Sequence, residues 1–249
     1  MANLFQRERQ RVIDACRRLA DTGYWVGTGG SLALRLDSKH LAATPSGTDY
    51  YLLQPADIAV LRVADLKQVS GTLPPSVESA MHAVMLEFWP QMEASIHTDQ
   101  PIASAAAILD RSIPISDASH IAALGREVAI TGYGPSGTIF LRHALRKKLR
   151  SDIHAYLLRG HGVICISPTL GEAEGRLALI EAVAARFLRQ GISDHNAKPT
   201  ALSRVALQVL MLHDQGLPVA PHGSDNRAGV SPDERAIEPL KPIRPGRSG

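Results

Sequence analysis

The sequence predicts an α/β fold with three layers, α/β/α, around a mainly antiparallel sheet. Hydrophobic residues make up 45% of the 249 residues, enough for a large core, whereas Phe, Trp and Tyr together make 4%, which favours helices packed on a sheet. Segments with apolar residues at helical spacing recur along the chain. In the first third, short strands follow one another through tight turns, which indicates antiparallel hairpins and not repeated βαβ units.

The first third is predicted to contain one helix and two hairpins. Apolar residues recur at helical spacing up to Leu19, and Gly23 lies where the chain would leave that helix. The alternating segment SLALRL is joined to the next strand by a short Asp-Ser-Lys turn. The expected elements are a helix over 4–19 and strands over 31–36, 40–44, 58–63 and 67–71.

The rest of the chain alternates between helical patterns and short apolar strands. The expected elements are helices over 76–89, 100–109, 138–150, 169–190 and 199–214, and strands over 94–99, 154–158 and 162–166. Between the second and third of these helices, a segment rich in Ile, Pro and Ser is expected to form a loop. We therefore expect a single domain over residues 1–215. Residues 216–249 are dense in proline, glycine and charge, and we expect an extended or disordered tail.

Charge and composition argue against several classes of protein. The net charge is +3, and the basic run 142–150 spreads around a predicted helix, so we expect no nucleic-acid partner. No apolar run approaches the roughly 20 residues that span a bilayer, and the N-terminus does not resemble a signal peptide. The two cysteines, Cys16 and Cys165, lie in apolar patterns typical of reduced core residues. A cytoplasmic protein without membrane association is expected.

Potential metal ligands lie at three places in the sequence. His97 and Asp99 are two positions apart in a predicted strand, so their side chains point to the same face. His161 lies between two later strands, in the segment RGHG. Two histidines and an aspartate can hold a divalent metal with positions left open for substrate. Glu78, four residues before His82 on a predicted helix, can supply the acid or base that such a site needs.

Five segments resemble the class II aldolase/adducin-like family, which includes metal-dependent sugar-phosphate lyases. Their order and spacing carry the resemblance over about residues 8–190. The segments are GTGGSLALR (27–35), TPSG (44–47), PSVESAMH (75–82), HTDQPIASAAAIL (97–109) and GHGVI (160–164). The resemblance implies a class II aldolase-like fold, carbohydrate metabolism and a homotetramer with active sites at subunit interfaces.

The resemblance also implies a role for each matching residue. Glu78 corresponds to the catalytic acid/base, and His97 and His161 correspond to metal ligands. The implied metal is a divalent ion (Zn, Mn or Fe), which stabilises an enediolate formed from a small hydroxy-carbonyl substrate, a sugar phosphate or a related compound. The positions that correspond to substrate-phosphate contacts are Ser31, Ser46, Gly47 and Ser76.

Three positions depart from the family pattern. Asp99 replaces a histidine ligand, which makes the site harder and shifts its preference from zinc towards manganese or iron. Ser31 replaces an asparagine that contacts phosphate, and Val77 replaces a second serine. Two other functions therefore stay open. The set His97, Asp99 and His161 also matches non-haem iron oxygenases, and the adducin branch of the family implies a non-catalytic interaction domain.

Overall fold

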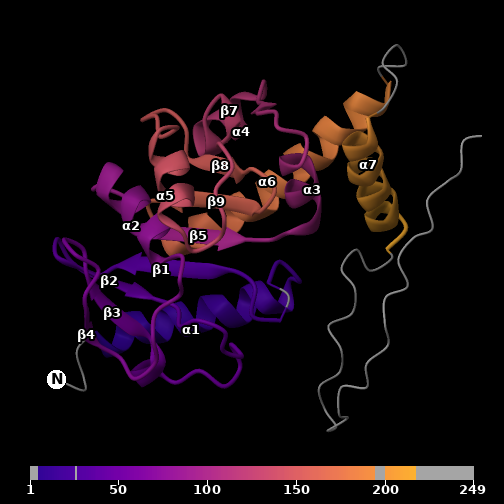
Figure 1. Cartoon of the computed structure of the whole chain (residues 1–249). Helices are drawn as coiled ribbons and strands as arrows, with labels where there is room; N and C mark the ends of the chain where they lie inside the picture. The colour runs from indigo at the N-terminus through magenta and orange to yellow at the C-terminus, as the bar shows by residue number, and fades with distance from the viewer. Residues whose placement is uncertain (1–4, 26, 194–199, 217–249) are drawn as a thin grey trace, which may run out of the picture.

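The computed structural model describes residues 5–25, 27–193 and 200–216, and a central sheet runs through it (Figure 1). The strands are β1 (Ser31–Arg35), β2 (His40–Ala43), β3 (Ala59–Arg62), β4 (Gln68–Ser70), β5 (Ala94–Thr98), β6 (Ile113–Pro114), β7 (Glu127–Ile130), β8 (Ala155–Leu158) and β9 (Gly162–Ser167). Within the described residues the sheet has nine strands in the order β4-β3-β2-β1-β5-β9-β8-β7-β6. Neighbouring strands are antiparallel except β7 and β8, which are parallel.

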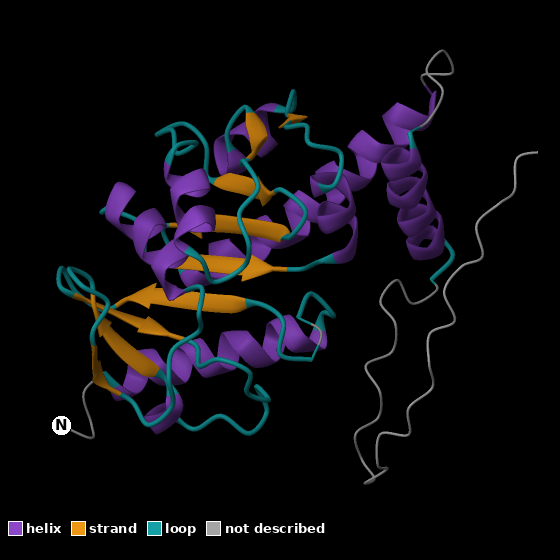
Figure 2. Ribbon diagram, viewed as in Figure 1, coloured by secondary structure: helices purple, strands orange, loops and turns teal. Residues whose placement is uncertain are grey.

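Helices cover both faces of this sheet, as Figure 2 shows. The helices are α1 (Gln6–Asp21), the 3-10 helix η1 (Pro55–Asp57), α2 (Ser79–Phe88), α3 (Pro101–Ala107), α4 (Ala118–Leu124), α5 (Ile139–Arg146), α6 (Leu170–Ser193) and α7 (Ala201–Asp214). Side chains of α1, α3 and α6 form one apolar core with the sheet, and side chains of α2 and α5 form a second core on the opposite face. The predicted mainly antiparallel α/β fold is therefore confirmed.

The alternation of side chains along the strands divides the two cores. In β1, Leu32 and Leu34 join the core of α1, α3 and α6, and Ala33 joins that of α2 and α5. In β5, Ala94 and Ile96 likewise join the first core. Because successive strand side chains point to opposite faces, the intervening polar residues of β5 must face α2 and α5.

Both predicted hairpins are confirmed, because β1 pairs with β2 and β3 pairs with β4 in antiparallel register. The loop predicted between residues 110 and 137 is wrong, since β6, α4 and β7 lie within it. Helix α4 is short and fully buries only Leu124, so its apolar pattern is too brief to predict a helix, although Asp117 caps it by accepting hydrogen bonds from the N–H groups of Ser119 and His120.

Other predictions concern the chain ends and the cysteines. The predicted tail lies outside the described residues, apart from Gly216. Both Cys16 and Cys165 are buried and carry free thiols, as expected for core residues. Among the described residues, no helix combines the length and apolar character that crossing a bilayer requires.

Candidate active site

The candidate site lies on the face of the sheet that α2 and α5 cover. His97 of β5 faces Ser31 of the neighbouring strand β1 in register, and on its other side it pairs with Ile164 of β9. Asp99 follows the end of β5, and His161 directly precedes β9. The antiparallel pairing of β5 with β9 therefore brings together the two histidines, although 64 positions separate them in the sequence.

Three potential ligands converge at this place. One carboxylate oxygen of Glu78, Oε2, lies 3.3 Å from Nε2 of His97, and the other, Oε1, lies 3.2 Å from Nε2 of His161. The ring centroids of the two histidines are 4.6 Å apart. The three ligand atoms all lie within 4.8 Å of one another, which suits the coordination shell of a single ion.

The orientation of the two imidazoles, with Nε2 of each facing Glu78, fits a divalent metal. Nδ1 of His97 lies 2.9 Å from the carbonyl oxygen of Val163, so Nδ1 carries a hydrogen, and Nε2, which faces Glu78, is the nitrogen that would bind an ion. In His161, Nδ1 is buried and has no hydrogen-bond partner among the described residues, and Nε2 faces the carboxylate. Two imidazole nitrogens and a carboxylate form a nitrogen and oxygen donor set that zinc, manganese and iron accept.

Asp99 lies at the edge of this cluster. Its Oδ1 atom is 3.5 Å from Nε2 of His97, but its side chain is 46% exposed, whereas that of Glu78 is 8% exposed. The close approach depends on Gly162, because a Cβ there would lie 2.4 Å from Oδ1 of Asp99 and 2.5 Å from the carbonyl oxygen of Thr98. Of the three residues predicted as ligands, His97 and His161 thus lie together in the cluster, and its third member is Glu78, whereas Asp99 approaches His97 from the edge.

The carboxylate of Glu78 and the imidazole of His161 shift each other's pKa values. Burial by itself would raise the pKa of Glu78, but the hydrogen bond with His161, the charge of His97 and the hydrogen bond from Ser136 outweigh it and lower that pKa. Burial would lower the pKa of His161, yet the Glu78 carboxylate raises it above its usual value. Without metal, the carboxylate is therefore held in its ionised form between two imidazoles.

A further histidine lies behind the carboxylate. His82 is 1% exposed, and burial, followed by the charge of His97, lowers its pKa to about 3. Its Nε2 lies 2.9 Å from Oγ of Ser31, and its Nδ1 lies 2.8 Å from Oγ of Ser95. The predicted helical spacing placed His82 next to Glu78. However, Glu78 precedes the first turn of α2, and Ser31 connects the two side chains, with its hydroxyl donating to Oε2 at 3.2 Å.

Ser136 is a contact of Glu78 that the sequence reasoning missed. Its hydroxyl donates to Oε1 of Glu78 at 2.7 Å, from the segment between β7 and α5. The serine lies in the glycine-rich stretch GYGPSG, within the segment expected to be a loop, and the sequence reasoning assigned it no role. Nothing in that stretch pairs it with Glu78, because the contact depends on how α5 packs against α2.

Three of the four predicted phosphate contacts, Ser46, Gly47 and Ser76, lie in two adjacent loops next to Glu78, and the fourth, Ser31, begins β1. An isolated bridge pairs Pro45 with Pro75, and the backbone N–H of Ser76 donates to the carbonyl oxygen of Thr44 at 2.8 Å. Ser46 and Gly47 are exposed, and Gly47 has a φ of 60°, a conformation that favours glycine. The hydroxyl of Ser76 accepts the backbone N–H of Glu78 at 3.2 Å. Ser31, in contrast, is only 1% exposed.

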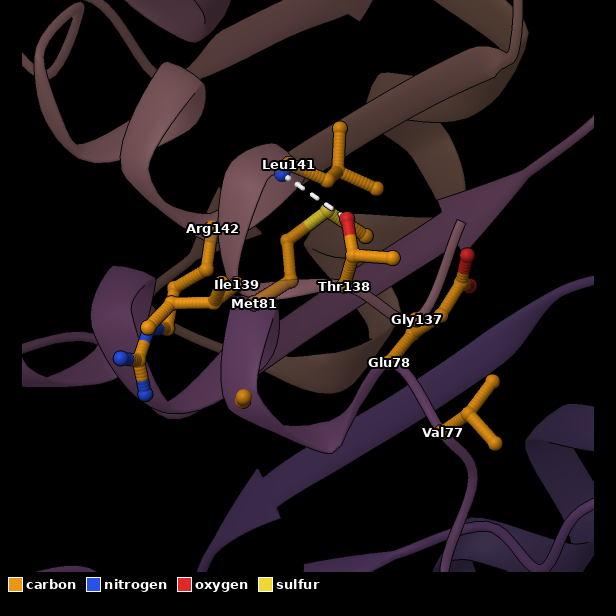
Figure 3. A pocket seen from close by; sticks show the side chains of 9 residues that line it. Val77, Glu78, Met81, Gly137, Thr138, Ile139, Leu141 and Arg142 are labelled. Carbon is orange, nitrogen blue, oxygen red and sulfur yellow. Dashed lines mark hydrogen bonds between the residues drawn. The ribbon is translucent and has the colours of Figure 1, made fainter. Parts of the chain in front are cut away.

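A hollow of about 170 Å³ lies between α2 and α5, lined by Glu78, Arg142 and mostly apolar side chains. In Figure 3, the carboxyl group of Glu78 and the guanidinium group of Arg142 lie at opposite ends and point away from each other. The carboxyl group faces the histidines, so the hollow lies behind the candidate metal centre and does not contain it.

Comparisons with known proteins agree with this geometry. The family pattern described as the Class II Aldolase and Adducin N-terminal domain matches residues 10–188. A 5-methylthioribulose-1-phosphate/5-deoxyribulose-1-phosphate aldolase from Rhodospirillum rubrum is 32% identical over 182 residues, 73% of this chain and 80% of that protein. A methylthioribulose-1-phosphate dehydratase from Yersinia enterocolitica is 27% identical, over 75% of this chain and 94% of that protein. The solved structure of an L-fuculose 1-phosphate aldolase has a TM-score of 0.68 at 24% identity, covering 83% of this chain and 95% of its own.

Proposed function

We propose that this chain, which belongs to the class II aldolase and adducin N-terminal domain family, is a divalent-metal-dependent lyase of the aldolase type. The proposed substrate is a small hydroxy-carbonyl compound of the ketose 1-phosphate class. The likeness to the Rhodospirillum rubrum aldolase supports this class and makes 5-deoxyribulose 1-phosphate the first compound to test. The observation that carries the proposal is the position of the Glu78 carboxylate, between the Nε2 atoms of His97 and His161.

The residues of the site have separate roles in this proposal. His97 and His161, with Glu78 and Asp99 beside them, would hold the ion. When bound, a divalent ion supplies Lewis-acid chemistry that stabilises the negative charge of an enediolate. Glu78 lies within reach of the same position, so it can exchange a proton with a substrate held there. The exposed Ser46 and the half-buried Ser76 offer hydroxyl groups to a phosphate, whereas their backbone N–H groups already donate to Pro74 and Thr44.

Cleavage of 5-deoxyribulose 1-phosphate by this route is a retro-aldol reaction. The hydroxyl at C4 loses its proton, the bond between C3 and C4 breaks, and the electron pair of that bond passes towards the carbonyl at C2. Protonation at C3 then completes the reaction, so the products are dihydroxyacetone phosphate and acetaldehyde. Glu78 is the group proposed to accept the proton of the C4 hydroxyl and to return a proton to C3, so that no proton is gained or lost overall.

The test is an anaerobic assay of the metal-stripped protein after addition of zinc, manganese or iron. We expect metal-dependent release of acetaldehyde, lost in Glu78→Gln and retained in Glu87→Gln, a change of an exposed carboxylate on the same helix. Loss of water without cleavage would instead favour a dehydratase, the activity named for the Yersinia enterocolitica relative. Iron binding with oxygen uptake would favour the oxygenase, and failure to bind any metal would favour the interaction domain.

Assembly into a homotetramer, with active sites completed at subunit interfaces, forms part of the same proposal. Large apolar side chains are exposed on α5 and on the segments that border the site, which supports an interface there. These side chains are Val77, Tyr133, Ile139 and Phe140. Light scattering should give a mass of about four chains, and a monomeric mass would overturn this part of the proposal.

A further inference from the structure

Three buried polar side chains form a connected chain behind Glu78. Ser31 and His82 are each 1% exposed, and Ser95 is 0% exposed. They come from β1, α2 and β5, so three separate elements contribute one polar group each to the same enclosed place. Buried polar groups destabilise a fold unless they are hydrogen-bonded, and here the hydrogen bonds run from Ser95 through His82 and Ser31 to Glu78.

Each serine hydroxyl has a single proton, and this fixes the direction in which the hydrogen bonds of the series donate. Ser31 donates its proton to Oε2 of Glu78, so towards His82 its oxygen can only accept. His82 must therefore carry its hydrogen on Nε2. A neutral imidazole with a hydrogen on Nε2 has a bare Nδ1, which can accept the proton of Ser95 at 2.8 Å. Each donor in this series of hydrogen bonds thus points towards the carboxylate of Glu78.

We propose that Ser95, His82 and Ser31 form a positioning relay that fixes Glu78 in the orientation required at the metal centre. The proposal rests on the proposed function, because it concerns the carboxylate assigned to that centre. The relay holds Oε2, while His161 and Ser136 contact Oε1. Ser31 accordingly acts on Glu78 from within the protein, and its hydroxyl is not offered to a substrate phosphate.

Ser95 controls the relay because it determines which nitrogen of His82 carries the hydrogen. Without the hydroxyl of Ser95, Nδ1 of His82 loses its donor, and the imidazole is free to carry its hydrogen on Nδ1 instead. Nε2 then becomes an acceptor for Ser31, whose single proton would be turned away from Glu78. Removal of a hydroxyl that does not touch Glu78 should therefore loosen the carboxylate.

The chain offers a matched control on the neighbouring strand. Ser167 of β9 is 0% exposed like Ser95, but its hydroxyl has no hydrogen-bond partner among the described residues. In the register of β5 with β9, Ser95 pairs with Ile166 and Ala94 pairs with Ser167, so the two serines lie one step apart. Ser95→Ala and Ser167→Ala each remove one fully buried hydroxyl from neighbouring strands, Ser95 on the face that α2 covers and Ser167 on the opposite face with Ala94, and only the first interrupts the relay.

The experiment measures cobalt binding and the cobalt absorption spectrum of the full chain with four substitutions. We expect Ser95→Ala and His82→Leu to bind Co²⁺ about 10- to 100-fold more weakly, with an altered spectrum, because groups that orient a metal ligand typically have effects of this size. Ser167→Ala should match the wild type. His82→Gln retains an N–H donor towards Ser31 and should recover much of the lost affinity, which a merely structural role for His82 would not predict.

A second measurement needs no substituted protein and no metal. Long-range ¹H–¹⁵N correlation spectra of the metal-free wild type should show His82 neutral, with its hydrogen on Nε2. A hydrogen on Nδ1 would overturn the relay. Equal cobalt affinity of Ser95→Ala and Ser167→Ala would overturn it too, while leaving the proposed function intact. A wild type that binds no Co²⁺ would overturn the proposed function and, with it, the positioning role.

Discussion

Replacement of Gly162 by alanine tests the close packing of β9 against the candidate metal centre. The added Cβ would lie 2.5 Å from the carbonyl oxygen of Thr98 and 3.0 Å from Cε1 of His97, whereas ordinary contact begins at 3.4 Å. The oxygen of Thr98 belongs to the backbone of a central strand, so it cannot turn aside as a flexible side chain can. Overpacking of this kind costs about 1–3 kcal/mol. It should also move His97 and Asp99 and weaken metal binding about 10- to 100-fold.

Urea unfolding and metal titration of Gly162→Ala would measure both effects. Gly175→Ala is the matched control, because Gly175 lies within α6 and nothing lies within 4 Å of its added Cβ. Alanine in a helix interior is favoured over glycine by roughly 0.5–1 kcal/mol, so this variant should unfold at a higher urea concentration than the wild type. If Gly162→Ala equalled the wild type in both stability and metal affinity, the packing described around His97 would be refuted.

Three further predictions concern a charge pair, a metal preference and a helix cap. In the metal-free protein, ionised Glu78 stabilises the fold above its ordinary pKa of 4.5, and this stability is lost as the pH falls through the lowered pKa of the folded state. Protonated His161 stabilises the fold below its ordinary pKa of 6.5, and this stability is lost as the pH rises through the raised pKa of the folded state. Glu78→Gln should therefore destabilise most between pH 4.5 and 6.5, and an equal effect in chemical denaturation at all pH values would contradict this. Asp99→His should raise the affinity for zinc relative to manganese, because imidazole is a softer ligand than carboxylate; an unchanged ratio in competition titrations would show that Asp99 does not bind the ion. Glu181 accepts two backbone N–H groups at the start of α3, at 2.7 and 2.9 Å, so Glu181→Ala should cost about 1–3 kcal/mol of unfolding free energy, against little for the exposed Glu87→Ala; equal losses would count against the cap.

Local patterns were sufficient to predict most of the fold. Hairpins are encoded by alternation and turn residues within a dozen positions, so the pairs β1–β2 and β3–β4 could be anticipated. The segment from β6 to β7 could not, because its elements are short. Strand β7 pairs in parallel with β8, a partner distant in sequence, and α4 has a single buried residue. Such elements depend on tertiary packing more than on local sequence.

In the candidate site too, local sequence patterns predicted some features, whereas others depend on tertiary packing. The shared face of His97 and Asp99 follows from strand alternation, which the sequence shows directly. The place of Glu78 beside both histidines depends on how α2 packs on β1 and β5, and the contact from Ser136 depends on α5. Spacing alone suggested that His82 and Glu78 share a helix face, but Glu78 lies at the helix cap and a serine from β1 joins them.

The most direct test of the account is a crystal structure of the protein with manganese or zinc, with the ion located by its anomalous scattering. The account predicts one ion at about 2.0–2.2 Å from Nε2 of His97 and Nε2 of His161, with a carboxylate oxygen of Glu78 in or beside its coordination shell. An ion bound elsewhere, with the two imidazoles turned away from each other, would contradict it.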